Sequence, residues 1–346
     1  MTIPRKNIVD KSSSGFYHRT TRCVRRAFLC GDDPWSGENY DHRREWIRSR
    51  LLVLESIFAA DLYAYAVMSN HYHVVLFMDV DRARSWSDEE VARRWLTLCP
   101  PRTAVNENPE APNQAGCFDN FVRELAGDAE RIALYRKRLC DLSWLMRFLN
   151  EYIARKANRE DRTKGRFWEG RFKTQALLDE GAVLACMAYV DLNPIRAGIA
   201  VTPEESEFTS VKQRLECVAA GGLEEKTLTP VTGTSHSDDA ENAHIHTARI
   251  NAIALRDYLQ LVDWTGRQIR EGKTGRIPDH LGPILERLGL DSAAWTDTAR
   301  GFGRRFGIAA GHWDRIRAKA FQTGRHWLHG VGASRQAYRV NLTACT

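Results

Sequence analysis

His71 and His73 are separated by one residue and follow a run of apolar and aromatic residues at 62–67. This pattern predicts a β-hairpin with strands at 62–67 and 71–78, joined by a turn at 68–70. Because successive side chains of a strand point to opposite faces, both imidazoles project from one face, roughly 6 to 7 Å apart. Two imidazoles aimed at one point suit a single metal ion held on a rigid element. The alternative is a pair of half-buried histidines that hydrogen-bond to their neighbours.

A second group of reactive side chains lies on a helix predicted at 179–193, which ends before Pro194 and Gly198. Its wheel places Tyr189 and Asn193 one turn apart, opposite the apolar stripe of the helix. The side chains beside them are small, so the sequence predicts an open face around the tyrosine hydroxyl. The alternative is an ordinary amphipathic helix whose tyrosine packs on a sheet. The stripe is Val183, Leu184, Met187 and Val190, and the small neighbours are Ala182, Ala185 and Cys186.

Residues 163–178 interleave cations with aromatic residues. Basic side chains can bind phosphates while aromatic rings stack on bases, which is how unpaired nucleotides are held. This segment is therefore a candidate DNA-binding surface, and the alternative is an edge strand with two core aromatics. The candidate DNA-binding residues are Arg166, Trp168, Arg171 and Lys173, with Phe167 and Phe172 as further rings.

The elements that must position these residues indicate an α+β fold. A strand at 16–23, a helix at 40–60, the hairpin and a helix at 141–158 capped by Asp141 predict a sandwich of helices on an antiparallel sheet. Residues 80–140 carry no recognisable chemistry and read as an insert, with a helix at 87–98 capped by Ser87, a polar loop at 106–116 and a helix at 118–138.

The C-terminal third is predicted to be helical. Residues 221–246 are polar and glycine-containing, as in a linker, and helices are predicted at 248–270, 280–288, 292–306 and 311–329. From Arg300 to the end there are nine Arg or Lys and one acid, Asp314. That excess favours an all-helical accessory domain that reads DNA, and a packing or oligomerisation domain is the alternative.

Length and composition agree with a globular protein. The chain has 346 residues, long enough for two domains, with 43% apolar and 27% charged residues. Eight cysteines are scattered without a C-x-x-C pair, which excludes zinc-finger spacing. The sequence has neither a signal-like apolar segment nor an apolar run long enough to span a membrane, so we expect no membrane association and a reducing, cytoplasmic location.

Three stretches in this order resemble the single-tyrosine HUH transposases of insertion sequences, in the branch called REP-associated tyrosine transposases. They are N-H-Y-H after an apolar strand, G-R-F-W-E-G-R-F-K, and A-Y-V-D-L-N-P-I-R-A-G. The resemblance covers about residues 17–211, and the stretch 80–140 departs from a minimal family core. It implies a ferredoxin-like sandwich for the catalytic domain, which we place at 1–220. Composition and helical pattern, not the resemblance, place the linker at 221–246 and the helical accessory domain at 247–346.

The resemblance also implies roles for individual residues. His71 and His73 would be metal ligands, Asn193 the third ligand and Tyr189 the nucleophile, while Tyr72 points away from the site. Two imidazoles and an amide oxygen leave positions open for phosphate oxygens and water, so Mg²⁺ or Mn²⁺ is the expected ion. Cleavage of single-stranded or hairpin DNA would leave a 5′-phosphotyrosine and a free 3′-OH, and the reverse reaction would rejoin strands without ATP.

Two other functions remain open. A domesticated DNA-hairpin-binding protein would keep the fold without turnover, although the intact set of four residues argues against it. A different metalloenzyme, such as an oxygenase that uses the two histidines, would need a carboxylate ligand and gives Tyr189 no role. A covalent protein–DNA adduct separates these possibilities. The sequence does not choose between a monomer and a homodimer.

Overall fold

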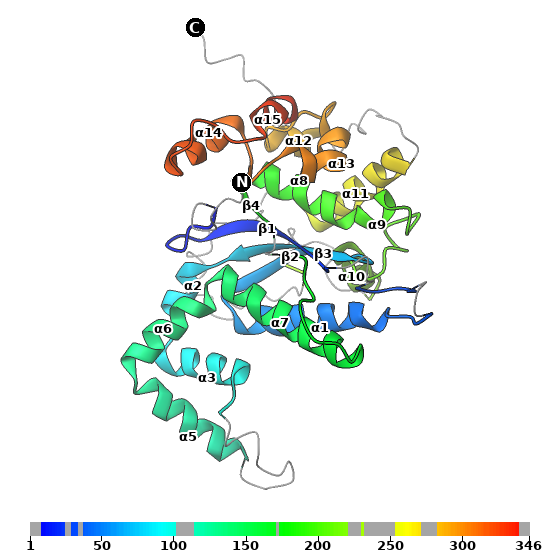
Figure 1. The fold of residues 1–346 in the computed structure, drawn as a ribbon. Coiled ribbons are helices and arrows are strands. Elements are labelled where there is room, and N and C mark those ends of the chain that lie inside the picture. Colours follow the sequence, from blue (N-terminus) through cyan, green and yellow to red (C-terminus); the bar gives the residue numbers. More distant parts are fainter. Residues whose placement is uncertain are drawn as a thin grey trace.

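The computed structural model describes residues 8–24, 29–33, 37–101, 114–170, 173–220, 230–231, 253–270 and 282–338. Most of the predicted linker at 221–246, most of the predicted loop at 106–116, and Arg171 with Phe172 lie outside these residues. The described part is a mixed α/β structure in which helices cover both faces of a five-stranded sheet (Figure 1).

The sheet has the order β2-β3-β1-β4-β5, and its first four strands are antiparallel neighbours. The predicted hairpin is confirmed, with Met68 N–H bonded to the His71 carbonyl at 2.8 Å across the turn. The two-residue β5 adds to β4 in parallel, so β4 is an interior strand and not an edge. The strands are β1 (Gly15–Arg22), β2 (Ala60–Val67), β3 (His71–Met78), β4 (Lys173–Leu177) and β5 (Ala309–Ala310).

One face of the sheet is covered by α1 (His42–Ile57) and α7 (Leu142–Glu160), which run side by side beneath it (Figure 1). Buried Arg43 ties the start of α1 to the end of α7, because its guanidinium pairs with Glu160 at 2.6 Å and with Asp161. Asp141 accepts the Ser143 N–H at 2.7 Å and caps α7 as the sequence predicts.

The insert at 80–140 extends from this face, and α5 lies farthest from the sheet (Figure 1). Its helices are α2 (Val80–Ser85), α3 (Asp88–Leu98), α5 (Gln114–Ala126) and α6 (Ala129–Leu139). Ser87 caps α3 as predicted. The single helix predicted at 118–138 is wrong: it is two helices, because Gly127 ends the first and the Asp128 side chain caps the second through the Arg131 N–H.

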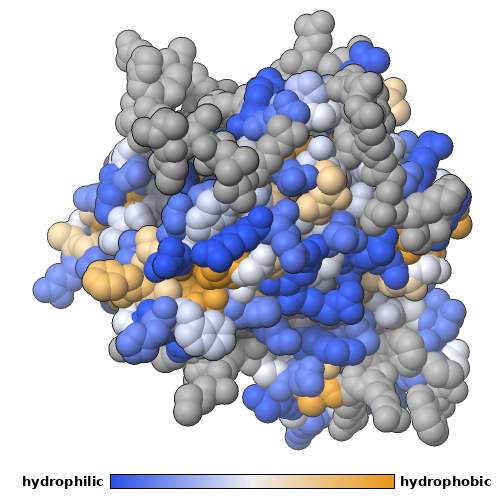
Figure 2. Space-filling model, turned by 90° about the horizontal axis from the view of Figure 1, so that it is seen from above, coloured by the Kyte–Doolittle hydropathy of each residue, from blue (hydrophilic) through white to orange (hydrophobic). Residues whose placement is uncertain are grey.

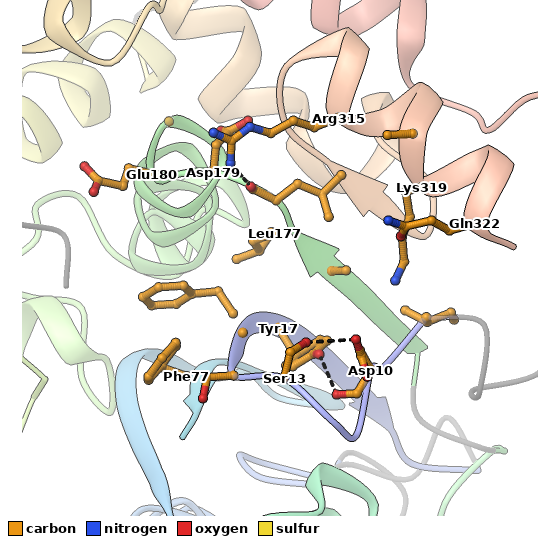
Figure 3. Close-up of a pocket in the computed structure, with 18 of the residues that line it drawn as sticks. Asp10, Ser13, Tyr17, Phe77, Leu177, Asp179, Glu180, Arg315, Lys319 and Gln322 are labelled. Atoms are coloured by element: carbon orange, nitrogen blue, oxygen red, sulfur yellow. Dashed lines mark hydrogen bonds between the residues drawn. The ribbon is translucent and has the colours of Figure 1, made fainter. Parts of the chain in front are cut away.

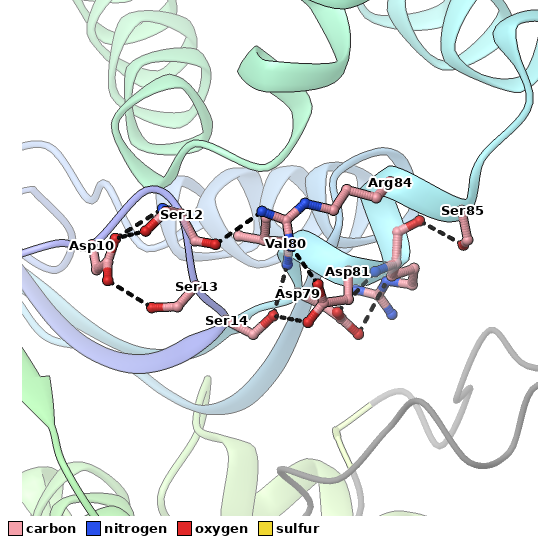
Figure 4. A network of polar contacts seen from close by, with 10 residues as sticks. Asp10, Ser12, Ser13, Ser14, Asp79, Val80, Asp81, Arg84 and Ser85 are labelled. Carbon is pink, nitrogen blue, oxygen red and sulfur yellow. Dashed lines mark hydrogen bonds and ion pairs between the residues drawn. The ribbon is translucent and has the colours of Figure 1, made fainter.

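The N-terminal segment is fastened to the beginning of α2 (Figure 4). Ser14 Oγ accepts the Val80 N–H at 2.9 Å, and the Arg84 guanidinium donates to the Ser12 carbonyl at 3.0 Å. Asp10 in turn accepts bonds from Ser12 and Ser13. These contacts fix the residues that lead into β1.

The opposite face of the sheet is covered by α8 (Glu180–Asp191), and a second layer of helices packs on α8 (Figure 1). The sequence predicts a separate accessory domain here, but in the described residues the C-terminal helices share one hydrophobic core with α8, and β5 joins the sheet. These further helices are α9 (Asn193–Arg196), α10 (Ser210–Ala219), α11 (Leu255–Arg270), α12 (Gly282–Arg287), α13 (Trp295–Arg305), α14 (Trp313–Gln322) and α15 (Val331–Ala337).

No helix in the described part of the chain is long and apolar enough to cross a lipid bilayer.

Candidate active site

The pairing of β1 with β3 gathers three histidines on the face of the sheet that α8 covers. Thr20 lies opposite His73 and Arg22 lies opposite His71. Because alternate residues share a face, His18 also projects toward His73. Tyr72 points to the other core, where its hydroxyl bonds to Asn150 Oδ1 at 2.6 Å. The side-by-side placement predicted for His71 and His73 is therefore present, and His18 joins them.

The three imidazoles are in close contact. The ring centroids of His71 and His73 are 5.0 Å apart, and those of His18 and His73 are 5.2 Å apart in a stacked arrangement. His18 Nε2 lies 2.9 Å from His73 Nδ1, and Thr20 Oγ1 lies 3.0 Å from the same nitrogen.

A chain of hydrogen bonds fixes which nitrogen of His73 carries the proton. Gln175 Nε2 donates to the Gly307 carbonyl at 2.8 Å, so the Gln175 amide oxygen faces His18 Nδ1 at 3.3 Å. That oxygen can only accept, so His18 carries its proton on Nδ1 and accepts through Nε2. His73 therefore donates from Nδ1 to His18, which leaves the lone pair of His73 Nε2 for another partner.

His71 is oriented in the same way by its chain neighbour. Its Nδ1 lies 2.7 Å from Asn70 Oδ1, an acceptor, so Nδ1 carries the proton and Nε2 keeps its lone pair. A ring that donates one N–H to an oxygen and offers its other nitrogen is the usual form of a metal-binding histidine.

Burial keeps the three rings neutral. Desolvation lowers the pKa of His18 to about 4, and desolvation with the nearby Arg22 and Arg196 charges lowers the pKa of His71 to about 4. The pKa of His73 is lowered well below its ordinary value, first by desolvation and then by the neighbouring imidazoles and Arg196. Neutral imidazoles are the form that binds a cation.

Tyr189 lies in the last turn of α8 and faces this histidine group. Its ring centroid is 5.7 Å from that of His73 and 6.0 Å from that of His18, both edge-on. The predicted open face of α8 is wrong, because α13 packs against α8 and nearly the whole helix is buried. Tyr189 itself remains half-buried, between the histidines and Phe302.

The backbone of α13 runs against the tyrosine hydroxyl. A Cβ atom added to Gly303 would lie 2.6 Å from the Tyr189 hydroxyl oxygen and 3.0 Å from Cζ. Gly303 is exposed, so the hydroxyl lies near the surface at a point where only a glycine leaves it room.

Asn193 is buried at the start of α9, directly after α8. The Arg196 guanidinium bonds to Asn193 Oδ1 at 3.1 Å and to the Tyr189 carbonyl at 3.4 Å, and it lies 4.2 Å from the Tyr189 ring centroid. Arg196 thus holds the predicted nucleophile and the predicted third ligand together. The Asn193 amide nitrogen is buried and has no hydrogen-bond partner in the described residues.

The donors present fit a small divalent cation. His71 and His73 offer Nε2 lone pairs, and an amide oxygen with two lone pairs can accept from Arg196 and still coordinate. In the described part of the chain, no three His, Cys, Asp or Glu side chains form a cage that could hold an ion by themselves. An ion held by two imidazoles and an amide would therefore keep positions for phosphate oxygens and water.

The predicted DNA-binding residues are divided between the two faces of the sheet. Lys173 is exposed and lies opposite Thr20, so it flanks the histidines. Trp168 packs on the other face, where its N–H donates to the Asn150 carbonyl at 2.8 Å and its ring meets Tyr72 edge-on. That packing commits the ring to the protein's own core, so the predicted stacking platform needs correction. Arg166 is exposed beside a small cavity at the ends of α1 and α7.

A groove of about 800 Å³ lies at the N-terminal end of α8, away from Tyr189, and Figure 3 shows residues that line it. Its acids and cations are mixed, and Asp179 is engaged in structural bonds: it caps α8 through the Ala182 N–H and accepts the Tyr338 hydroxyl at 2.6 Å. The Arg315 guanidinium donates to the Leu178 carbonyl at 2.6 Å. This groove therefore contributes nothing to the histidine and tyrosine site.

Four residues of the site are absent from the sequence-based prediction. His18, Gln175 and Gly303 meet the site only through strand register and helix packing, which no local pattern encodes. Arg196 had a signal, because it lies one turn after Asn193 in the motif A-Y-V-D-L-N-P-I-R-A-G.

Comparison with known proteins gives a distant structural likeness. No protein-family model matches the chain, and no curated protein matches it. A solved structure of a REP-associated tyrosine transposase bound to a REP hairpin is similar, with 14% identity and a TM-score of 0.36. The similarity covers 67% of this chain and 90% of that chain. A likeness of this degree assigns no function, which must be argued from the side chains.

Proposed function

We propose that this protein cleaves and rejoins single-stranded DNA through a 5′-phosphotyrosine intermediate, at sites associated with hairpins. In this proposal residues 1–220 form the catalytic unit, a ferredoxin-like sandwich with the insert at 80–140. The strand order β2-β3-β1-β4 with helices between β1 and β2 and between β3 and β4 supports that description.

The observation that carries the proposal is the meeting of Tyr189 with the histidine group. A tyrosine ring lies edge-on to two neutral histidines, beside a buried amide and a guanidinium, with its hydroxyl near the surface. A tyrosine that only packs in a hydrophobic core does not require histidines, an amide and a guanidinium around its ring. Together they offer a nucleophile, ligands for a cation and a positive charge within one site.

The proposed reaction is a transesterification at a phosphodiester of the DNA strand. The Tyr189 oxygen attacks the phosphorus and loses its proton, the P–O3′ bond breaks, and the 3′ oxygen leaves as a hydroxyl after it takes up a proton. A bound Mg²⁺ or Mn²⁺ would supply charge neutralisation at the phosphate and make phosphorus more electrophilic. His71, His73 and Asn193 would hold that ion.

The remaining residues of the site would stabilise charge on the tyrosine and bind the phosphates of the DNA. Arg196 lies close enough to Tyr189 to stabilise the negative charge that develops when the tyrosine hydroxyl loses its proton. Lys173 and Arg22, both exposed on the histidine face, would contact neighbouring phosphates. Because the phosphotyrosine keeps the phosphoryl bond, a second 3′-OH can reverse the step and join strands.

Two observations favour the alternative of a hairpin-binding protein without turnover. Helix α13 packs against one side of Tyr189, and Arg196 already occupies one lone pair of Asn193. Such a protein would bind hairpin DNA and never become attached to it.

The test is cleavage of a set of single strands that carry hairpins, labelled at the 5′ or the 3′ end. With Mg²⁺ or Mn²⁺ we expect one product with a free 3′-OH and a second that migrates with the protein after denaturation. Excess chelator should abolish both, and His73→Ala should do the same while DNA affinity stays within about threefold, since phosphate contacts dominate binding. Tight hairpin binding with neither product would support the alternative.

A further inference from the structure

A second groove lies between the C-terminal end of α13, α14 and α15. Its volume is about 640 Å³. Its charged and aromatic lining consists of Arg305, Arg317, His326, Trp327, His329 and Arg335, and none of the described residues that line it is acidic.

The groove presents an aromatic ring to solvent. Trp327 is 72% exposed, an unusual state for the largest apolar side chain. Arg317 and Arg335 are also exposed on the same lining, and Arg305 is held in place by a bond to Gln336 Oε1 at 2.5 Å. The surface around the C-terminal helices is largely hydrophilic, with apolar patches between the polar side chains (Figure 2).

The groove is connected to the histidine site by a short path. The Gly307 N–H donates to the His329 carbonyl at 3.2 Å, and the Gly307 carbonyl accepts from Gln175, which orients His18. Arg305 lies two residues beyond Gly303, whose backbone meets the Tyr189 hydroxyl. The groove and the Tyr189 hydroxyl therefore meet the same last turn of α13.

We propose that this groove binds an unpaired segment of DNA, with a base stacked on Trp327 and phosphates on Arg317 and Arg335. Guanidinium groups pair with phosphate oxygens, and an exposed indole accepts a base of any type on its face. A duplex keeps its bases stacked inside, so it would leave Trp327 unused. The inference rests on the proposed function for its substrate class, but it concerns binding and not cleavage.

The experiment measures binding of a 5′-fluorescein-labelled oligothymidylate of about 12 nucleotides to the full chain by anisotropy. Tyr189→Phe serves as the parent so that no strand is cut. We expect Trp327→Ala to weaken binding roughly 5- to 150-fold and Trp327→Phe to retain most of the affinity. Arg317→Ala and Arg335→Ala should each reduce the slope of log affinity against log salt by about 0.7.

Two exposed residues outside the groove serve as matched controls. Phe321 on α14 is 87% exposed, and Arg131 on α6 is exposed and pairs with Asp128. Phe321→Ala and Arg131→Ala should leave both affinity and salt slope unchanged. All the substituted side chains are exposed, so thermal unfolding of each variant should match that of the parent.

Loss of affinity confined to the groove variants would confirm the proposal, whatever the outcome of the cleavage test. Unchanged affinity and salt slope in Trp327→Ala and the two arginine variants would overturn it. The proposal would also be overturned if the same substitutions weakened the binding of a blunt duplex of the same length by the same factor. The groove would then bind DNA by its charge and not by its unpaired bases. If groove binding is intact and no strand is ever cut, only the proposed cleavage fails.

Discussion

At the scale of single residues, the site depends on hydrogen bonds that hold neutral histidines in one tautomer. Gln175 is the key residue, because it joins the Gly307 carbonyl to His18 and so directs the Nε2 lone pair of His73 outward. It touches neither the candidate ion nor the DNA, so its role is positioning.

Gln175→Leu should lower Mn²⁺ affinity by about 10- to 100-fold, because His18 loses the acceptor that fixes its proton. Isothermal titration with Mn²⁺ measures this without any need for turnover. Thr174→Val, one residue earlier on β4 and facing the other core, is the control and should leave Mn²⁺ affinity unchanged. Equal Mn²⁺ affinity in Gln175→Leu and the parent would refute the hydrogen-bond chain.

At the scale of elements, the packing of α13 on α8 determines the surroundings of Tyr189, the proposed nucleophile. Gly303 is the point where the Tyr189 hydroxyl meets the α13 backbone. The sequence predicts an open face at the small residues of α8, but these residues are buried in the hydrophobic core.

Gly303→Ala should reduce the rate of adduct formation by roughly a hundredfold, because the new methyl group displaces the Tyr189 oxygen from its position. Gly301→Ala on the same helix meets only the flexible Arg305 side chain and is the matched control. Both changes should raise helix stability by about 0.8 to 1 kcal/mol, so only the effect on tyrosine position separates them. Single-turnover rates that are equal for the two variants would contradict this account.

Some of the helices and strands can be predicted from local sequence, and others cannot. Alternation and turn residues were sufficient for the hairpin, and caps such as Ser87 and Asp141 were sufficient for the starts of α3 and α7. His18 was missed because the register of β1 against β3 is a long-range property. The two-residue β5 was missed because it is too short to carry any periodicity.

At the scale of the whole molecule, a buried carboxylate joins the C-terminal helices to residues 1–220. Asp191, at the end of α8, accepts the Tyr258 hydroxyl of α11 at 2.5 Å, the Val211 N–H at 3.1 Å and the Ser210 hydroxyl of α10. Burial raises the pKa of Asp191, while nearby Arg214 and these donors act in the opposite direction. The two parts are thus expected to unfold together.

Tyr258→Phe should lower the free energy of unfolding by about 1.5 to 3 kcal/mol, because a hydrogen bond to a buried carboxylate is lost. Urea denaturation followed by circular dichroism and by tryptophan fluorescence should give one coincident transition in both proteins. Tyr152→Phe, at a 39% exposed tyrosine, should change the free energy of unfolding by less than about 0.5 kcal/mol. Two separate transitions, with only one moved by Tyr258→Phe, would show that the C-terminal helices fold independently.

The proposed function requires that the Tyr189 oxygen becomes bonded to DNA. The measurement is peptide mapping by mass spectrometry of protein incubated with hairpin-bearing single strands and Mn²⁺, for the parent and for Tyr189→Phe. We predict a nucleotide adduct on the peptide that contains Tyr189, and no adduct anywhere in the phenylalanine variant, which should keep its fold and its affinity for Mn²⁺ and DNA. An adduct mapped to another residue, or one that persists in Tyr189→Phe, would contradict the assignment of α8 to the active site.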